Sequence, residues 1–209
     1  MYFIGFSGAH RTGKTTTAVS VSKELGEGFQ FIETNISSVL AKYGLDPKKE
    51  MSFSERLFIQ DAILSKAVLT YEKYSSLSEE SGRFFIFDRT PVDYLAYLLA
   101  DVPSTGLSSE DEARLERFSG RCTELMNQYF LKIIFFQQGI EASNESGKAV
   151  ISFGYQSLLD FIMKGVLLDE RVLVDSNIIP QNLTRFDLRV EFCKSRLIAL
   201  KNNVSRMAG

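Results

Sequence analysis

The hydrophobic positions of this chain form short continuous runs that alternate with longer amphipathic stretches. Apolar, β-branched and aromatic runs of this length predict strands, and unbroken runs are typical of a sheet covered on both faces. They occupy residues 2–7, 29–33, 84–88, 132–137 and 171–175. The alternation of such strands with helices predicts an α/β fold of three layers, in which helices flank a five-stranded parallel sheet.

Apolar residues at helical spacing predict helices at residues 15–26, 52–78, 91–101, 109–129, 155–168 and 186–200. Gly26 suits a helix end, and Pro91 suits the first turn of a helix. The helix at 52–78 is apolar nearly all round, so we expect it to be largely buried. No repeat or long linker interrupts the pattern, which predicts a single domain over residues 1–209.

Composition narrows the classes of protein that fit. The chain has 209 residues, 44% of them hydrophobic and 24% charged, with a formal net charge of -2. This apolar content excludes wholesale disorder, and the lack of a basic surplus argues against a dedicated polyanion binder, although a local basic groove stays open. No segment is long and apolar enough to cross a membrane, and the start of the chain does not fit a signal peptide, so we expect a soluble, cytoplasmic protein with no membrane partner.

Histidine and cysteine are scarce. One His and two Cys cannot supply the four ligands of a zinc site made only of imidazole and sulfur. The single His10 also leaves little scope for a Ser-His-Asp triad. Cys122 and Cys193 are far apart in sequence, which is typical of a reducing compartment.

The strongest motif directly follows the first predicted strand. Residues 8–15, GAHRTGKT, match GxxxxGK[ST] at every fixed position, and a helix pattern follows. In such a loop the glycines allow backbone N–H groups to converge on phosphate oxygens, while the lysine reaches the terminal phosphates and the hydroxyl binds Mg²⁺. We therefore expect a nucleotide phosphate site made by Gly8, Ala9, His10, Arg11, Thr12, Gly13, Lys14, Thr15 and Thr16.

A second element lies at the end of the third predicted strand. Phe84 to Phe87 form an apolar run that ends in Asp88. A carboxylate with this rigid support can orient Mg²⁺ together with Thr15. A helix-capping role for Asp88 is the alternative.

The chain carries no NKxD motif and no LSGGQ-like motif, so it fits neither the GTPase switches nor the transporter ATPases. It resembles instead the P-loop nucleoside and nucleotide kinases, including the deoxynucleoside kinases, the thymidylate-kinase-like enzymes and the nicotinamide riboside kinase group. The resemblance runs from about residue 2 to residue 200, and the element Asp88-Arg89-Thr90 carries it together with the P-loop. It implies a P-loop NTPase fold, ATP and Mg²⁺ as cofactors, and Lys14 and Asp88 in catalysis.

The resemblance also assigns residues to the phosphate acceptor. It implies that Arg89 holds the acceptor or the transferring phosphoryl group, and that Glu33, at the end of the second strand, is a general base for a hydroxyl acceptor. Thr34 departs from the family, which usually has Pro there. Gln60 on the long helix corresponds to a base-binding Gln, and we expect Arg56 and Asp93 to join the same pocket. Structural roles stay open for all of these residues.

The predicted lid is where the chain departs most from the family. Kinases of this type close an arginine-bearing lid over the phosphates after the fourth strand, but the candidate lid loop here, residues 139–153, contains no Arg. Lys148 could act alone, or Arg89, Arg171 or Arg185 could replace the missing side chain. Since lid arginines stabilise the transition state, this gap leaves the acceptor undefined.

The sequence therefore predicts a Mg²⁺-ATP-dependent phosphotransferase for a small-molecule nucleoside or nucleotide. Two alternatives stay open. One is a kinase acting on a hydroxyl of nucleic acid or of a modified base in DNA, with Lys42, Lys48, Lys49 and Arg56 as the nearest basic cluster. The other is a regulatory module that hydrolyses ATP without an acceptor. A homodimer is also left open.

Overall fold

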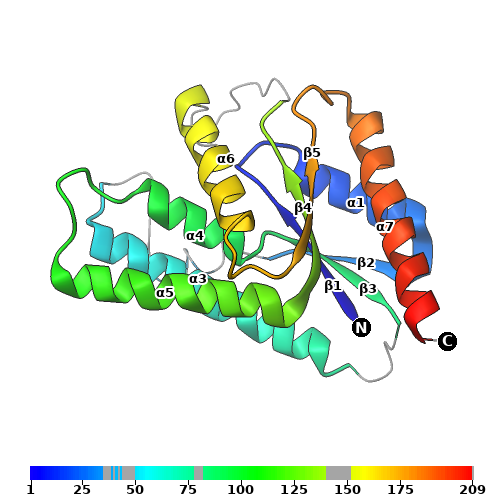
Figure 1. The fold of residues 1–209 in the computed structure, drawn as a ribbon, viewed down its shortest axis with the longest axis horizontal. Helices are drawn as coiled ribbons and strands as arrows, with labels where there is room; N and C mark the ends of the chain where they lie inside the picture. The colour runs from blue at the N-terminus through cyan, green and yellow to red at the C-terminus, as the bar shows by residue number, and fades with distance from the viewer. Residues whose placement is uncertain are drawn as a thin grey trace.

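The sheet is parallel throughout. The computed structural model describes residues 1–34, 39, 41, 43, 50–77, 82–139 and 152–208. Within these residues five strands pair in the order β2-β3-β1-β4-β5 (Figure 1). They are β1 Tyr2–Ser7, β2 Phe29–Ile32, β3 Phe84–Asp88, β4 Phe130–Phe136 and β5 Asp175–Ile179.

Helices cover both faces of the sheet, so the predicted three-layer α/β fold is confirmed. On one face pack α3 Phe53–Ser75, α4 Pro91–Ala100, α5 Ser109–Tyr129 and α6 Phe153–Leu167, and on the other pack α1 Lys14–Leu25 and α7 Phe186–Ala208 (Figure 1). A short 3-10 helix, η1 Gly26–Gly28, joins α1 to β2.

Alternate residues of each central strand serve the two cores. In β1, Phe3 belongs to the α3–α6 side, whereas Ile4 and Phe6 belong to the α1/α7 side. The same alternation separates Phe85 from Ile86 in β3. Because both faces are buried, the strands are apolar at nearly every position, which is why they could be recognised as unbroken runs. The two cysteines are buried free thiols, Cys122 in the first core and Cys193 in the second.

The fifth strand lies later in the chain than predicted. The apolar run at 171–175 was expected to be the strand, but β5 begins at Asp175, which is aligned with Lys132 of β4 and forms an ion pair with it. The preceding Val172 and Val174 pack against the α3–α6 core from a loop, where the Val172 N–H donates to the Asp169 carbonyl. Only Ile179 of β5 is buried, so this strand tolerates polar residues and hydrophobicity alone pointed to the wrong segment.

The long helix α3 is only partly buried, which corrects the expectation of a nearly buried helix. Its inner side packs in the core, but Phe58 and Leu69 are 50% and 61% exposed. The helix lies at the outside of the α3–α5 pair, so one of its sides has no neighbour among the described elements (Figure 1). None of the described helices combines the length and apolar character that a membrane crossing needs.

Candidate functional site

The P-loop joins the carboxyl end of β1 to the first turn of α1. Gly8 has a φ of 147°, and a Cβ there would lie 2.4 Å from the Phe136 carbonyl oxygen. Gly13 has a φ of 81° at the helix N-cap. Both positions require glycine, because side chains disfavour these backbone angles. The loop therefore takes the left-handed turns that bring its N–H groups toward the start of α1.

Lys14 lies inside this loop. Its Nζ donates to the carbonyl oxygens of Gly8 and Ala9, each at 2.6 Å. Burial, together with the nearby Arg89 charge, lowers the pKa of Lys14 to about 8, against the opposing effect of Asp93 and Asp88. The ammonium is thus held by uncharged carbonyl groups, and an incoming anion can compete for it.

Thr15 and Asp88 are in direct contact across the sheet edge. Asp88 is aligned with Phe6 in the β1–β3 register, and the Thr15 hydroxyl donates to its Oδ2. The other oxygen, Oδ1, is buried and has no hydrogen-bond partner in the described part of the chain. A hydroxyl beside a carboxylate with a free oxygen fits Mg²⁺, which takes few protein ligands when phosphates and water supply the rest. The described residues contain no cluster of three or more His, Cys, Asp or Glu side chains suited to a metal.

Arg89 follows directly and has an unusual backbone. Its φ is 76°, its N–H donates to the Phe6 carbonyl at 2.9 Å, and its guanidinium carbon lies 5.5 Å from the centre of the Tyr97 ring. A non-glycine residue with a left-handed φ is strained, and such strain is concentrated at functional sites. The guanidinium lies against Tyr97, and its permanent positive charge interacts with the carboxylates of Asp93 and Asp88.

Glu33 leaves the sheet beside Asp88. Ile32 is aligned with Phe87, so the residues that follow, Glu33 and Asp88, leave adjacent strands at the same edge. The Thr34 hydroxyl donates to the Asp88 carbonyl and so links the segment after β2 to the end of β3. Glu33 is exposed and helps to line a cavity of about 210 Å³ with Thr34, Val39, Ile63, Lys66, Ala67, Thr70 and Tyr94. The cavity is therefore connected to the end of β3 through Thr34, which lines it and contacts the Asp88 carbonyl.

Gln60 and Arg56 were both expected in the acceptor pocket, and neither of them lines the 210 Å³ cavity. Gln60 is half-buried on α3, three residues before Ile63 and seven before Ala67, so it lies on the helix side that faces the 210 Å³ cavity without lining it. Arg56 forms an ion pair with Asp101 at 3.1 Å, at the far end of α4.

Known structures share this fold. A deoxyadenosine kinase from M. mycoides, with dCMP and dCDP bound, superposes with a TM-score of 0.68 at 16% identity, over 94% of this chain and 99% of that chain. A thymidylate kinase from Candida albicans superposes with a TM-score of 0.68 at 15% identity, over 96% and 92%. A thymidylate kinase from Ehrlichia chaffeensis gives 0.54 at 12% identity, over 94% and 97%. The chain has the P-loop nucleoside and nucleotide kinase fold. No family model and no curated protein sequence matches it.

In this kinase fold Asp93 supports the P-loop from the core, whereas the sequence analysis expected it in the acceptor pocket with Gln60. The side chain is fully buried. Its Oδ1 accepts the Gly8 N–H at 3.1 Å, and its Oδ2 accepts the N–H and hydroxyl of Thr90 at 2.9 and 3.1 Å. Asp93 therefore caps α4 and holds the start of the loop, a role that both of its oxygens serve.

His10 also packs against the supporting helices. Its backbone N–H donates to the Tyr97 hydroxyl at 3.0 Å, and its carbonyl accepts from Gln156 of α6 at 3.0 Å. Burial and the charges of Arg89, Lys14 and Arg11 lower the pKa of its imidazole, which favours the neutral ring at pH 7. Thr15 and Thr16, by contrast, are exposed at the start of α1.

Arg189 stabilises the P-loop and its neighbouring segments, a role that the sequence analysis missed. It lies on α7, is fully buried, and donates to the carbonyl oxygens of Leu183, Thr12 and Gln137 at 2.5, 2.8 and 3.5 Å. One guanidinium thereby connects the P-loop to the end of β4 and to the segment before α7. The only sequence signal was a charged residue on the apolar side of a predicted helix.

We expect Arg189→Met to lower the free energy of unfolding by about 2–4 kcal/mol, because it leaves buried carbonyl groups without donors. For a chain of this size that corresponds to a thermal midpoint roughly 5–10 °C lower. Calorimetry measures this shift, with the exposed Arg206→Met on α7 as the matched control. Equal midpoints for the two variants would contradict the structural role of Arg189.

The residues predicted to replace the lid arginines lie in different parts of the fold. Arg171 lies before β5, at the sheet end opposite the P-loop, and pairs with Asp169 at 2.8 Å. Arg185 lies beyond β5, on the P-loop side, and pairs with Asp187. Most of the candidate lid, 140–151 with Lys148, lies outside the described residues, as do Lys42, Lys48 and Lys49. Among the described alternatives, Arg89 directly follows Asp88 in the chain, and its charge interacts with the Asp88 carboxylate.

Proposed function

We propose that this protein is a Mg²⁺-ATP-dependent phosphotransferase that phosphorylates a nucleoside, a nucleotide or a related small molecule. One observation carries the proposal: the Thr15 hydroxyl of the P-loop meets Asp88 of β3, whose second oxygen is buried and without a partner among the described residues, and Arg89 follows directly. A phosphate cradle, a pair of cation-binding oxygens and an arginine are thereby assembled at one sheet edge.

The residues of the loop have distinct roles in this proposal. The N–H groups of Gly8 to Thr15 and the start of α1 bind the phosphates, and Lys14 turns from the Gly8 and Ala9 carbonyls toward the terminal phosphates. Thr15 and Asp88 hold Mg²⁺, which when bound offsets the negative charge of the phosphates. This site needs no further protein carboxylate.

The acceptor binds in the 210 Å³ cavity beside Asp88. Arg89 binds the acceptor or the transferring phosphoryl group, since its guanidinium presents several donors to phosphate oxygens. Glu33 at the cavity wall accepts the proton of a hydroxyl acceptor, and it only positions a phosphate acceptor, which needs no strong base. Gln60 binds a base edge from α3.

A substrate screen tests this proposal. The purified protein is incubated with labelled ATP, Mg²⁺ and a panel of nucleosides and nucleoside monophosphates, and transfer of the label is measured. Turnover that depends on an added acceptor supports the kinase. Slow hydrolysis that no acceptor changes would identify a regulatory module instead. Transfer only to oligonucleotides, with loss of activity as salt increases, would identify the nucleic-acid kinase.

The lowered pKa of Lys14 predicts a pH dependence of ATP binding. In the free protein the ammonium loses its proton as the pH passes about 8, whereas bound phosphates favour the charged form. ATP affinity should therefore be constant near pH 7 and fall by up to about tenfold per pH unit above about 8. Titration calorimetry at pH 7, 8 and 9 measures this, with Lys14→Ala as a weak-binding control that lacks the dependence. Constant affinity in the wild-type protein would contradict the assignment.

A further inference from the structure

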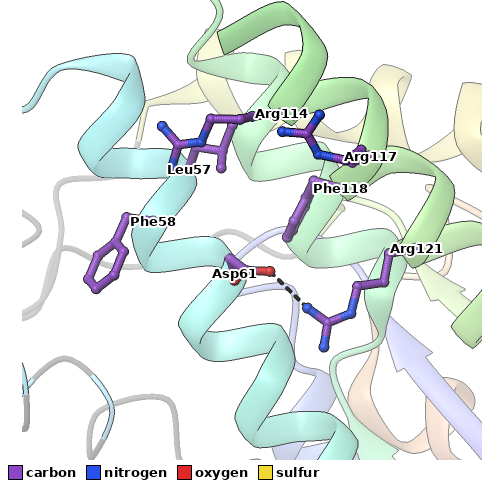
Figure 2. Close-up of a pocket in the computed structure, with 7 residues that line it drawn as sticks. All are labelled: Leu57, Phe58, Asp61, Arg114, Arg117, Phe118 and Arg121. Atoms are coloured by element: carbon purple, nitrogen blue, oxygen red, sulfur yellow. Dashed lines mark hydrogen bonds and ion pairs between the residues drawn. The ribbon is translucent and has the colours of Figure 1, made fainter. Parts of the chain in front are cut away.

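Away from the P-loop, α3 and α5 enclose a cavity of about 300 Å³ with a cationic wall (Figure 2). Three arginines line it from α5, namely Arg114, Arg117 and Arg121. They are spaced by three and four residues, so they share one side of the helix over about 10 Å. Leu57 and Asp61 of α3 lie opposite the arginines, and Phe118 lies between the helices (Figure 2). The ring of Phe58, which also lines the cavity, points away from α5 (Figure 2).

The positive charge of this cavity is only partly balanced. Arg121 forms an ion pair with Asp61 at 2.8 Å, and Arg114 forms one with Asp111 at 3.3 Å. The side chain of Arg117, which is exposed, has no recorded hydrogen bond or ion pair within the described residues. Asp61 is the only carboxylate among the described residues that line the cavity, and Asp111 lies just outside the lining. Two of the three guanidinium groups are therefore paired, and Arg117 carries the unbalanced positive charge.

The surplus of arginines and the apolar surface of this cavity together indicate the class of ligand. Guanidinium groups bind phosphate oxygens in pairs of parallel hydrogen bonds, and several of them along one helix suit a group with more than one anionic oxygen. Leu57 and Phe58 add apolar surface, and the Phe58 ring is half-exposed against Tyr43 at 5.4 Å between centroids. A hollow of about 300 Å³ is in the range of small-molecule sites.

We propose that the cavity between α3 and α5 binds a small phosphorylated molecule, with its phosphate groups on Arg114 and Arg117 and its apolar or planar part against Leu57 and Phe58. This site is separate from the P-loop and does not rest on the proposed function. Because α3 also carries Ile63, Lys66 and Ala67 of the acceptor cavity, the two sites share one helix.

Titration calorimetry with inorganic pyrophosphate at low ionic strength tests this site. The wild-type protein should bind pyrophosphate at two sites, one lost in Lys14→Ala and the other weakened about tenfold in Arg117→Ala. Arg117 is exposed, so its removal leaves the core intact, and Arg206→Ala on α7 is the matched control. Asp61→Asn should strengthen binding at this site several-fold, because it removes the opposing carboxylate and frees Arg121.

Two results would overturn the proposal. In the first, binding is lost in Lys14→Ala and is the same in Arg117→Ala, Asp61→Asn and the wild-type protein, so that only the P-loop binds pyrophosphate. In the second, sedimentation shows a dimer that is weaker in Arg117→Ala, and the cavity between α3 and α5 binds no pyrophosphate. This result would assign the cavity to the contact with a second copy of the chain. Failure of the proposed kinase activity would leave the Arg117-dependent site unchanged, so the two proposals fail separately.

Discussion

Asp88→Asn is expected to lower the turnover number with Mg²⁺-ATP by on the order of 10²–10³-fold, because the lost charge of a metal-binding carboxylate costs several kcal/mol of transition-state stabilisation. The amide is nearly isosteric and can still accept from the Thr15 hydroxyl, so the fold should be unchanged. Steady-state kinetics over a range of Mg²⁺ concentrations measures the effect, with the acceptor found in the substrate screen.

Thr15→Val gives a second test of the same cation site. It removes the other proposed oxygen ligand at an exposed position, so folding is not at risk and the apparent Mg²⁺ affinity should fall. The exposed Asp187→Asn, far along the chain on α7, controls for the loss of one negative charge. Full activity of Asp88→Asn at limiting Mg²⁺ would exclude Asp88 as a metal ligand and leave it a capping or structural role.

Asp93→Ala is expected to lower the free energy of unfolding by about 3–5 kcal/mol, the largest stability effect that we predict for a single side chain. The change removes both acceptors of a fully buried carboxylate, and it leaves the N–H groups of Gly8 and Thr90 without partners. The capping box of α4 loses its Asp93 half at the same time, while Thr90 remains the N-cap. Urea denaturation followed by circular dichroism measures the difference.

Asp93→Asn separates the contribution of the hydrogen bonds to stability from the contribution of the side-chain volume. It keeps one acceptor and nearly the same shape, so its effect should be clearly smaller than that of Asp93→Ala. The exposed Asp187→Ala should change stability by at most about 1 kcal/mol, since surface ion pairs contribute little. A loss within 1 kcal/mol for Asp93→Ala would show that the P-loop does not depend on this carboxylate.

The sequence analysis succeeded where local patterns carry the information. The loop of residues 8–15 was recognisable because its glycines, lysine and threonine have fixed spacing and lie between a strand and a helix. Four strands were placed close to their observed positions because both faces of the sheet are buried. The fifth strand was misplaced because only Ile179 of β5 is buried, so the strand needs no apolar run, and Val172 and Val174 pack from a loop.

The roles of individual polar side chains were harder to predict. Asp93 was expected to face the acceptor, since it follows the Asp88-Arg89-Thr90 element by one turn of helix, but it accepts from Gly8, 85 residues earlier in the chain. Arg189 contacts Thr12 across 177 residues. No local pattern contains such pairs, because they exist only after the strands and helices have packed.

The sequence by itself determined the phosphate cradle, the alternation of strands and helices, and the carboxylate at the end of an apolar strand, because each depends on neighbours within a few residues. Only the tertiary structure decided that β3 lies beside β1, so that Asp88 meets Thr15, and that three arginines of α5 line a cavity against α3. Strand order and helix packing bring distant segments together, and the periodicity of one segment says nothing about which other segment will lie against it.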